Sequence, residues 1–89
     1  SNGELSILTD NRINQTLLDA FYFKDYNQKR RELGIKDNFY FTIEGLTISG
    51  NPTPFVGNIP PINNQNSVKI ERIVLYNNKP TKLELYIWR

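Results

Sequence analysis

The sequence of 89 residues contains no cysteine and no histidine. Without cysteine it has no disulfide framework and no thiolate ligand for a metal, so its own core, or neighbours in an assembly, must hold the fold together. Without histidine it lacks the side chain that most often transfers protons near neutral pH. Serine nucleophiles of the usual type are excluded as well, because no histidine partner and no Gly-x-Ser-x-Gly elbow accompany them. We therefore expect a protein that is not an enzyme and that uses no cofactor or metal.

Long apolar runs are also absent. No stretch of about 18 apolar residues is present, so this sequence contains no segment that would span a membrane as a helix. The opening Ser1-Asn2 is typical of a cleaved tag, which predicts that native N-terminal residues, including any signal or anchor, have been removed. We assign residues 1–8 to this tag remnant and a lead-in. Residues 9–89 are expected to form a single α+β domain, because a chain of this length supports one modest core.

Charge of one sign does not dominate the chain. The 11 Lys and Arg residues are mixed with 9 Asp and Glu residues, and the net charge is only +2. The triplet Lys29-Arg30-Arg31 and some exposed aromatic residues are the elements of a platform for single-stranded nucleic acid. The last turn of a helix explains this triplet more simply, because cations there favour the helix dipole. We therefore expect no nucleic-acid partner.

The acidic residues are spread along the chain without the spacing that a metal site or a general acid/base pair requires. Glu71 and Glu84 are expected to face water on strands. There they are predicted to pair across the sheet with Lys82 and Lys69.

Helical patterns occupy the first third of the chain. An amphipathic helix is predicted from an N-cap at Thr9 or Asp10. A second helical segment is predicted from a cap at Asp25 to a C′ residue at Gly34. One kinked helix and two short helices fit this pattern equally. The apolar residues at three- and four-residue spacing in the first segment are Ile13, Leu17, Leu18 and Phe21.

Strand patterns fill most of the remaining chain. In Asn38–Glu44 apolar and polar residues alternate, and Leu46–Ser49 is predicted to pair antiparallel with that strand. Val68–Tyr76 breaks its alternation near its middle, which predicts a bulge or a strand covered on both sides. Thr81–Trp88 alternates cleanly and should pack one face on the helix. The predicted fold is α+β, with an N-terminal amphipathic helix, kinked or split in two, packed on a four-stranded antiparallel β-meander. The order of the strands stays open, because the last hairpin could insert elsewhere with the same local pattern.

The segment 50–67 holds four of the five prolines and is predicted to be a long exposed loop. Apolar residues on such a loop do not join a sheet core easily and often mark a surface that binds a partner. The predicted contact surface combines outward-facing aromatic residues with apolar loop residues: Tyr40, Phe55, Val56, Ile59, Ile62, Tyr86 and Trp88.

Three segments carry a family resemblance: Leu33-Gly34-Ile35, Tyr40–Ile43 and the final hairpin Val68–Trp88. Together with the expected order of elements, they resemble the globular head of type IV pilins and pseudopilins, archaeal pilin-like proteins most of all. The resemblance implies a non-enzymatic structural subunit of a cell-surface filament or secretion pseudopilus. It also implies an extracellular or cell-surface location, other filament subunits as partners, and contact with a membrane only through a removed N-terminal helix.

Two alternatives stay open. The first is a free-standing small α+β binding module that recognises a peptide or carbohydrate through the loop and an open strand edge. The second is a small nucleic-acid-binding protein, whose binding would weaken steeply with salt.

Overall fold

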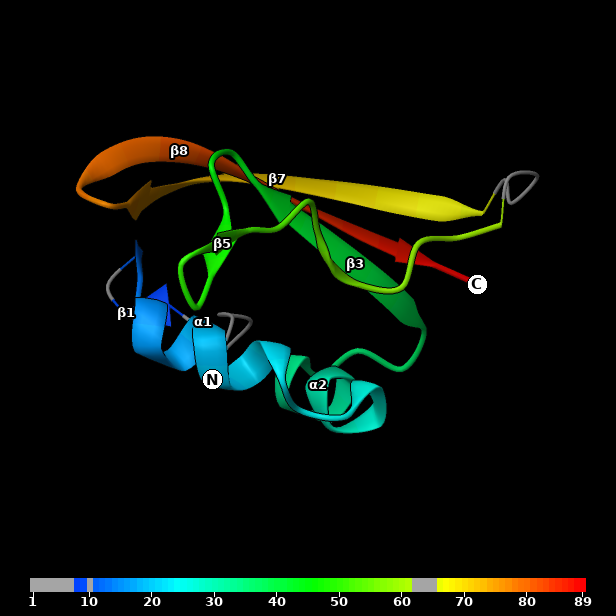
Figure 1. Cartoon of the computed structure of the whole chain (residues 1–89). Coiled ribbons are helices and arrows are strands. Elements are labelled where there is room, and N and C mark those ends of the chain that lie inside the picture. Colours follow the sequence, from blue (N-terminus) through cyan, green and yellow to red (C-terminus); the bar gives the residue numbers. More distant parts are fainter. Residues whose placement is uncertain (1–7, 10, 62–65) are drawn as a thin grey trace.

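A computed structural model of the chain describes residues 8, 9, 11–61 and 66–89. Strands dominate, and two short helices lie together near the start of the chain (Figure 1). The elements in chain order are β1 (Leu8–Thr9), β2 (Arg12–Ile13), α1 (Gln15–Tyr22), α2 (Tyr26–Leu33), β3 (Asn38–Ile43), β4 (Thr47–Ile48), β5 (Asn51–Pro52), β6 (Val56–Gly57), β7 (Ser67–Tyr76) and β8 (Lys79–Trp88).

The predicted helix on a four-stranded antiparallel meander is wrong. The described strands form a six-stranded mixed sheet in the order β1-β2-β7-β8-β3-β6, and a separate two-stranded sheet made of β4 and β5. The mixed character comes from β2, which runs parallel to β7 and pairs with it at Arg12 and Leu75. The last strand, β8, lies between β7 and β3 and is antiparallel to both. A meander would instead place each strand beside its neighbours in sequence.

Two helices form, so the question of one kinked helix or two short ones is settled. The first begins later than predicted: Asn14 is its N-cap and accepts a hydrogen bond from the Leu17 amide at 3.1 Å. Thr9 lies in β1, and Asp10 lies outside the described residues. The second helix confirms the prediction, because Asp25 caps its N-terminus and Gly34 ends it in the left-handed conformation that favours glycine.

The alternation predicted for the strand that became β3 is confirmed, since Phe39, Phe41 and Ile43 are all buried. Its predicted pairing with the next segment is wrong. A turn at Gly45, with φ of +75°, ends β3, and β4 then pairs with β5 instead. The segment 50–67, predicted as a long exposed loop, thus supplies β5 and also β6. Strand β6 pairs with the edge of β3 that lies opposite β8. Gly57 permits that close approach, because a Cβ there would lie 2.5 Å from the carbonyl oxygen of Phe39.

The C-terminal hairpin is regular along its whole length. All ten residues of β7 pair in unbroken register with β8, so the predicted bulge is absent. The connection has two residues, Asn77 and Asn78, with φ of +53° and +64°, which matches a type I′ turn. The alternative prediction, a strand covered on both sides, is also wrong, because most of the first half of β7 is exposed.

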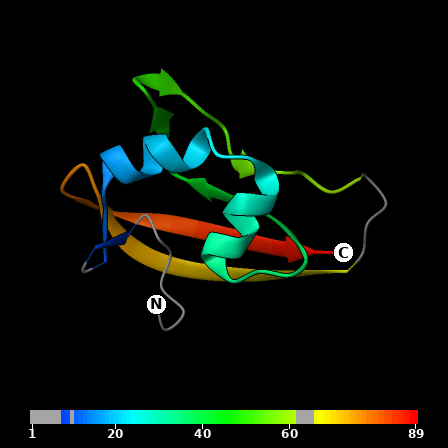
Figure 2. The same cartoon turned by 90° about the horizontal axis from the view of Figure 1, so that it is seen from below.

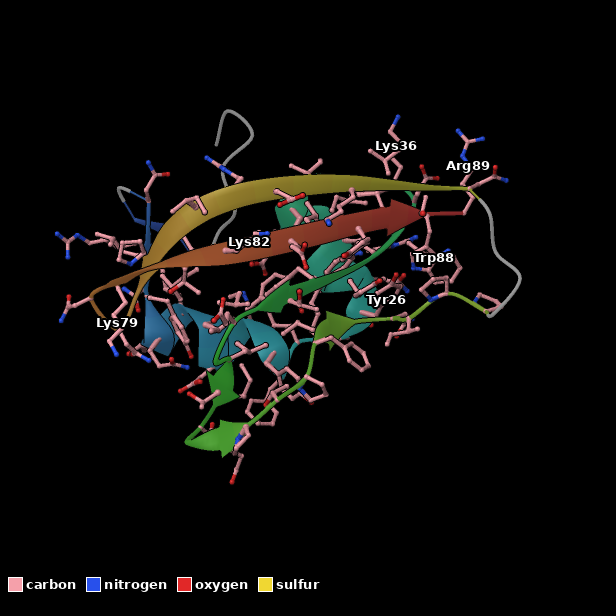
Figure 3. All side chains as sticks on the ribbon, turned by 90° about the horizontal axis from the view of Figure 1, so that it is seen from above. Tyr26, Lys36, Lys79, Lys82, Trp88 and Arg89 are labelled. Carbon is pink, nitrogen blue, oxygen red and sulfur yellow. The ribbon has the colours of Figure 1, made fainter. Side chains whose placement is uncertain are left out.

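The helices cover one face of the large sheet and leave the other face open (Figures 2 and 3). Leu18 and Phe21 of α1 are buried against it, and Leu83 and Leu85 of β8 are buried on the same side as predicted. Ile87 is partly buried there. Leu17, which was predicted to join this face, is 43% exposed. The core therefore lies between the helices and the inner face of β3, β7 and β8. It consists of Leu18, Phe21, Phe39, Phe41, Ile43, Leu46, Ile48, Val56, Val74, Tyr76, Leu83 and Leu85.

Candidate protein-interaction surface

The outer face of the sheet carries an aromatic cluster. Tyr40 of β3 and Tyr86 of β8 are direct cross-strand partners, and their rings stack with centroids 4.5 Å apart and planes 9° apart. Phe55 meets Tyr40 edge-on at 6.3 Å. Burial raises the pKa of the Tyr40 hydroxyl, and nearby Tyr86 and Glu84 raise it further. Three of the residues predicted for the contact surface, Tyr40, Phe55 and Tyr86, therefore lie together.

The other predicted contact residues separate. Trp88 donates its indole N–H to the carbonyl oxygen of Asn58 at 2.9 Å, which ties the loop after β6 to the end of β8. Ile59 follows in that loop and is 55% exposed. Val56 is wrong as a surface residue, because its side chain is completely buried in the core between β3 and the helices. Ile62 lies outside the described residues.

Beside the aromatic cluster, four charged residues of the β7–β8 hairpin form a ladder on the same face. Glu71 and Glu84 lie directly opposite each other, which alone would be repulsive. Lys69 bridges them, with its ammonium 2.9 Å from Glu84 and 3.3 Å from Glu71. Lys82, whose position on the face is labelled in Figure 3, lies 3.4 Å from Glu71. The predicted pairing across the sheet is therefore confirmed.

These ion pairs shift the protonation of their members. Hydrogen bonds to Glu84 and Glu71 raise the pKa of Lys69 above its ordinary value. Hydrogen bonds from Lys69 and Lys82 lower the pKa of Glu71. All four side chains are at least partly exposed to solvent, so salt screens their contribution to stability. The ladder fixes the positions of charges along β7 more than it stabilises the fold.

The edge of β7 opposite β8 is the second feature of this surface. One edge of β7 pairs with β8 along its whole length. On the other edge, the described residues pair with β7 only near its C-terminal end, where the Leu75 amide donates to the Asn11 carbonyl at 2.9 Å. Backbone groups alternate in direction along a strand. Because those of Leu75 point away from β8, the N–H and C=O groups of Lys69, Glu71 and Ile73 point the same way. We call residues 67–73 the open edge of β7; Figures 2 and 3 show it at the margin of the sheet.

Apolar side chains flank the open edge. Val68 is 62% exposed and Ile70 is 41% exposed, and both lie on the helix-side face of the sheet, since they stand opposite Ile87 and Leu85 of β8. Ile73, on the outer face, is 65% exposed. Exposed apolar residues beside unpaired strand backbone are the features that allow another strand to add to a sheet.

The predicted contact surface does not include the open edge of β7. The alternative of a small binding module names an open strand edge but does not say which strand forms it. Lys69 and Glu71 alternate with apolar residues in β7, and charged side chains are common on natural edge strands. This alternation alone does not mark an edge, because the central strand β8 has the same pattern with Lys82 and Glu84.

The part of the chain that the structure describes offers little for other kinds of site. It holds no group of three or more acidic side chains arranged to bind a metal. Among its helices, none is both long and apolar enough to cross a membrane.

Comparisons with protein-family models, with curated proteins and with solved structures each give no match for this chain.

Proposed function

We propose that this chain is a non-enzymatic protein-interaction module that binds an extended polypeptide strand at the open edge of β7. The observation that carries the proposal is the run of backbone groups at Lys69, Glu71 and Ile73 that face away from β8, beyond which the described chain places no strand. An added strand would satisfy these groups with the same hydrogen bonds that join β7 to β8.

The form of β7 supports this function. Natural edge strands are commonly protected by proline, a bulge or very short length. β7 is ten residues long, contains no proline and keeps an unbroken register with β8. The protection that it does carry is a pair of charged side chains, Lys69 and Glu71, which a partner of suitable charge would match.

A peptide fits the surface better than a carbohydrate does. Carbohydrate sites commonly present free aromatic ring faces, whereas Tyr40 and Tyr86 stack on each other and so cover one face of each ring. The aromatic cluster is better suited to hold β3 and β8 in register beside the edge.

The filament subunit implied by the pilin resemblance is a narrower proposal of the same structural class. A pilin head would have a helix that continues upstream into the stem. Here α1 begins after its cap Asn14 and is preceded by strand β2, which counts against this proposal. N-terminal sequencing of the mature protein from its native host, in membrane and shed-filament fractions, tests it. A mature chain that begins with an apolar stretch in those fractions would support a filament subunit, and a soluble chain without one would contradict it.

Selection from a phage-displayed library of random short peptides, on sparsely immobilised protein, tests the strand-binding function. The decisive variant is Glu71→Pro. Proline removes an amide that points away from β8, and the backbone hydrogen bonds between β7 and β8 stay in place. Glu71→Gln is the matched control, since it removes the same charge and keeps the amide.

We expect the selected peptides to bind the wild type and Glu71→Gln, and to lose roughly ten-fold or more in affinity for Glu71→Pro, the loss of one or more backbone hydrogen bonds. Circular dichroism of all three proteins confirms that they are folded. Failure to select any peptide, or equal binding to Glu71→Pro, would overturn the proposal.

A further inference from the structure

We propose that the strand bound at the open edge of β7 comes from a second copy of this chain, paired antiparallel about a two-fold axis at Ile70. This inference rests on the proposed function and names the partner of the same edge. In this arrangement Ile70 faces Ile70 of the second copy, and Lys69 faces the second copy's Glu71. The two large sheets then join into one continuous sheet.

The directions of the backbone groups allow this register. Antiparallel strands exchange hydrogen bonds only between facing residues whose N–H and C=O groups both point toward the partner. With the axis at Ile70, Lys69 faces Glu71 of the second copy and Ser67 faces Ile73 of the second copy. The backbone N–H and C=O groups of all four residues point away from β8, because these directions alternate along the strand and those of Leu75 point away from β8. The two copies would therefore exchange about eight backbone hydrogen bonds, two for each of the facing pairs.

The limits of the open edge give the same centre. β7 begins at Ser67, and β2 occupies the edge of β7 opposite β8 at Leu75. The segment 67–73 is therefore the part of this edge that pairs with no other described strand. Ile70 is the midpoint of that segment. A register displaced toward the hairpin turn would bring the second copy against β2.

Charge selects this register over its neighbours. A two-fold axis at Lys69 would place that lysine against its own copy, and an axis at Glu71 would place two glutamates face to face. Like charges directly opposite each other destabilise a strand pair. An axis at Ile70 instead makes two pairs of opposite charge, because the arrangement is symmetric. The edge is thus self-complementary in hydrogen bonding, length and charge, which is the requirement for an isologous dimer.

Apolar contact on the helix side adds to this pairing. Ile70 and its copy form a pair without backbone hydrogen bonds, the kind in which side chains approach most closely, and Val68 of each copy lies diagonal to Ile70 of the other. These two side chains are 41% and 62% exposed in the single chain. The strand-to-strand contact is small compared with the interface of a permanent dimer, so we expect association that depends on protein concentration.

Two complementary variants test the register. Lys69→Glu places the introduced glutamate against the second copy's Glu71, and Glu71→Lys places the introduced lysine against the second copy's Lys69. Each variant alone should self-associate roughly ten-fold or more weakly than the wild type, because two attractive pairs become repulsive. When the two variants are mixed, every facing pair again has opposite charges, and the mixture should associate as the wild type does. Any effect of either substitution on the fold is the same alone and in the mixture, so recovery on mixing reports the contact between copies.

Sedimentation velocity over a wide range of protein concentration provides the readout, with Glu71→Pro as the variant that blocks the edge. The proposal requires a wild-type dimer, a monomeric Glu71→Pro protein, and recovery on mixing the charge variants. It would be overturned by a monomeric wild type, by a dimer that persists in Glu71→Pro, or by no recovery in the mixture. If peptides selected on the wild type still depend on the edge while the wild type stays monomeric, the strand-binding function stands and the second copy is not its partner. If both experiments fail, the strand-binding function fails as well.

Discussion

The hydroxyl of Tyr76 donates a hydrogen bond to the side-chain oxygen of Gln15, 2.9 Å away. The same hydroxyl accepts a hydrogen bond from the backbone amide of Thr47 at 3.0 Å. One buried side chain at the end of β7 thereby joins the large sheet, helix α1 and the small β4–β5 sheet. The second half of β7 is held from several directions, whereas its first half is held only by β8 in the described structure.

Tyr76→Phe should destabilise the fold by about 1–3 kcal/mol, because it leaves the partly buried Gln15 and Thr47 groups without this partner. Chemical denaturation of the purified variant measures the change. The control is Tyr86→Phe, whose hydroxyl makes only a 3.5 Å contact with Glu84; its cost should stay within about 0.5 kcal/mol. Equal effects of the two substitutions would contradict the role assigned to Tyr76.

Amide hydrogen exchange should alternate along β7 in dilute protein. The amides of Lys69 and Glu71 point to the open edge and should exchange quickly, whereas the amide of Ile70 points to β8 and should be protected. The amide of Leu75 is an internal control, since it also points away from β8 yet bonds to the carbonyl oxygen of Asn11. NMR at low protein concentration resolves these residues. Uniform protection from Lys69 to Ile73 under those conditions would show that the edge is not open.

Acid should weaken the charge ladder through Glu71. Its pKa is lowered in the folded chain, so its stabilising contribution is complete above its ordinary value of 4.5 and disappears as the pH falls through the lower folded value. The pKa of Lys69 is raised, so its contribution is complete below its ordinary value of 10.5 and is lost only as the pH rises past the folded value.

An NMR titration of the Glu71 carboxyl carbon checks the direction of its shift. Removing its partners by a Lys69→Gln and Lys82→Gln double substitution should return the pKa toward its ordinary value, and high salt should do the same in part. An unchanged pKa in the double variant would contradict the hydrogen bonds described for the ladder.

Val56 and Ile59 should differ sharply although both belong to the proline-rich segment. Val56→Ala removes atoms from a fully buried side chain and should cost about 1–3 kcal/mol. Ile59→Ala changes a side chain that is 55% exposed and should cost less than about 0.5 kcal/mol. Thermal and denaturant unfolding of the two variants gives the comparison, and a large loss for Ile59→Ala would mean that this residue packs more tightly than the structure shows.

The features that the sequence predicts correctly are local. The caps at Asp25 and Gly34 depend on residues within one helical turn, and the burial of Phe39 and Phe41 follows from alternation within one strand. The Lys69–Glu84 pair is predictable for a similar reason, because a hairpin places these two residues diagonally across neighbouring strands on one face. Even so, local chemistry left two competent caps for the first helix, and a third residue, Asn14, is the one that caps it.

The features that the sequence does not reveal depend on contacts between distant segments. Alternation says which face of a strand is buried and says nothing of which strand lies beside it, so the insertion of β8 between β7 and β3 could not be derived. The proline-rich composition of its segment predicts that Val56 lies on the surface, yet Val56 pairs with Phe41 of β3 and is fully buried. The open edge depends on the same information, because a strand is an edge only by virtue of what fails to pair with it. The contact of Tyr40 with Tyr86 likewise requires the register of β3 on β8.

The central position of β8 also bears on how the protein is made. Synthesis proceeds from the N-terminus, so β3 and β7 leave the ribosome before the strand that must lie between them. Until β8 emerges, the inner apolar faces of both strands lack their common neighbour, and the helices have no complete sheet to cover. The nascent chain should therefore stay incompletely folded until β8 has emerged, and during that interval it would be most exposed to chaperones and proteases.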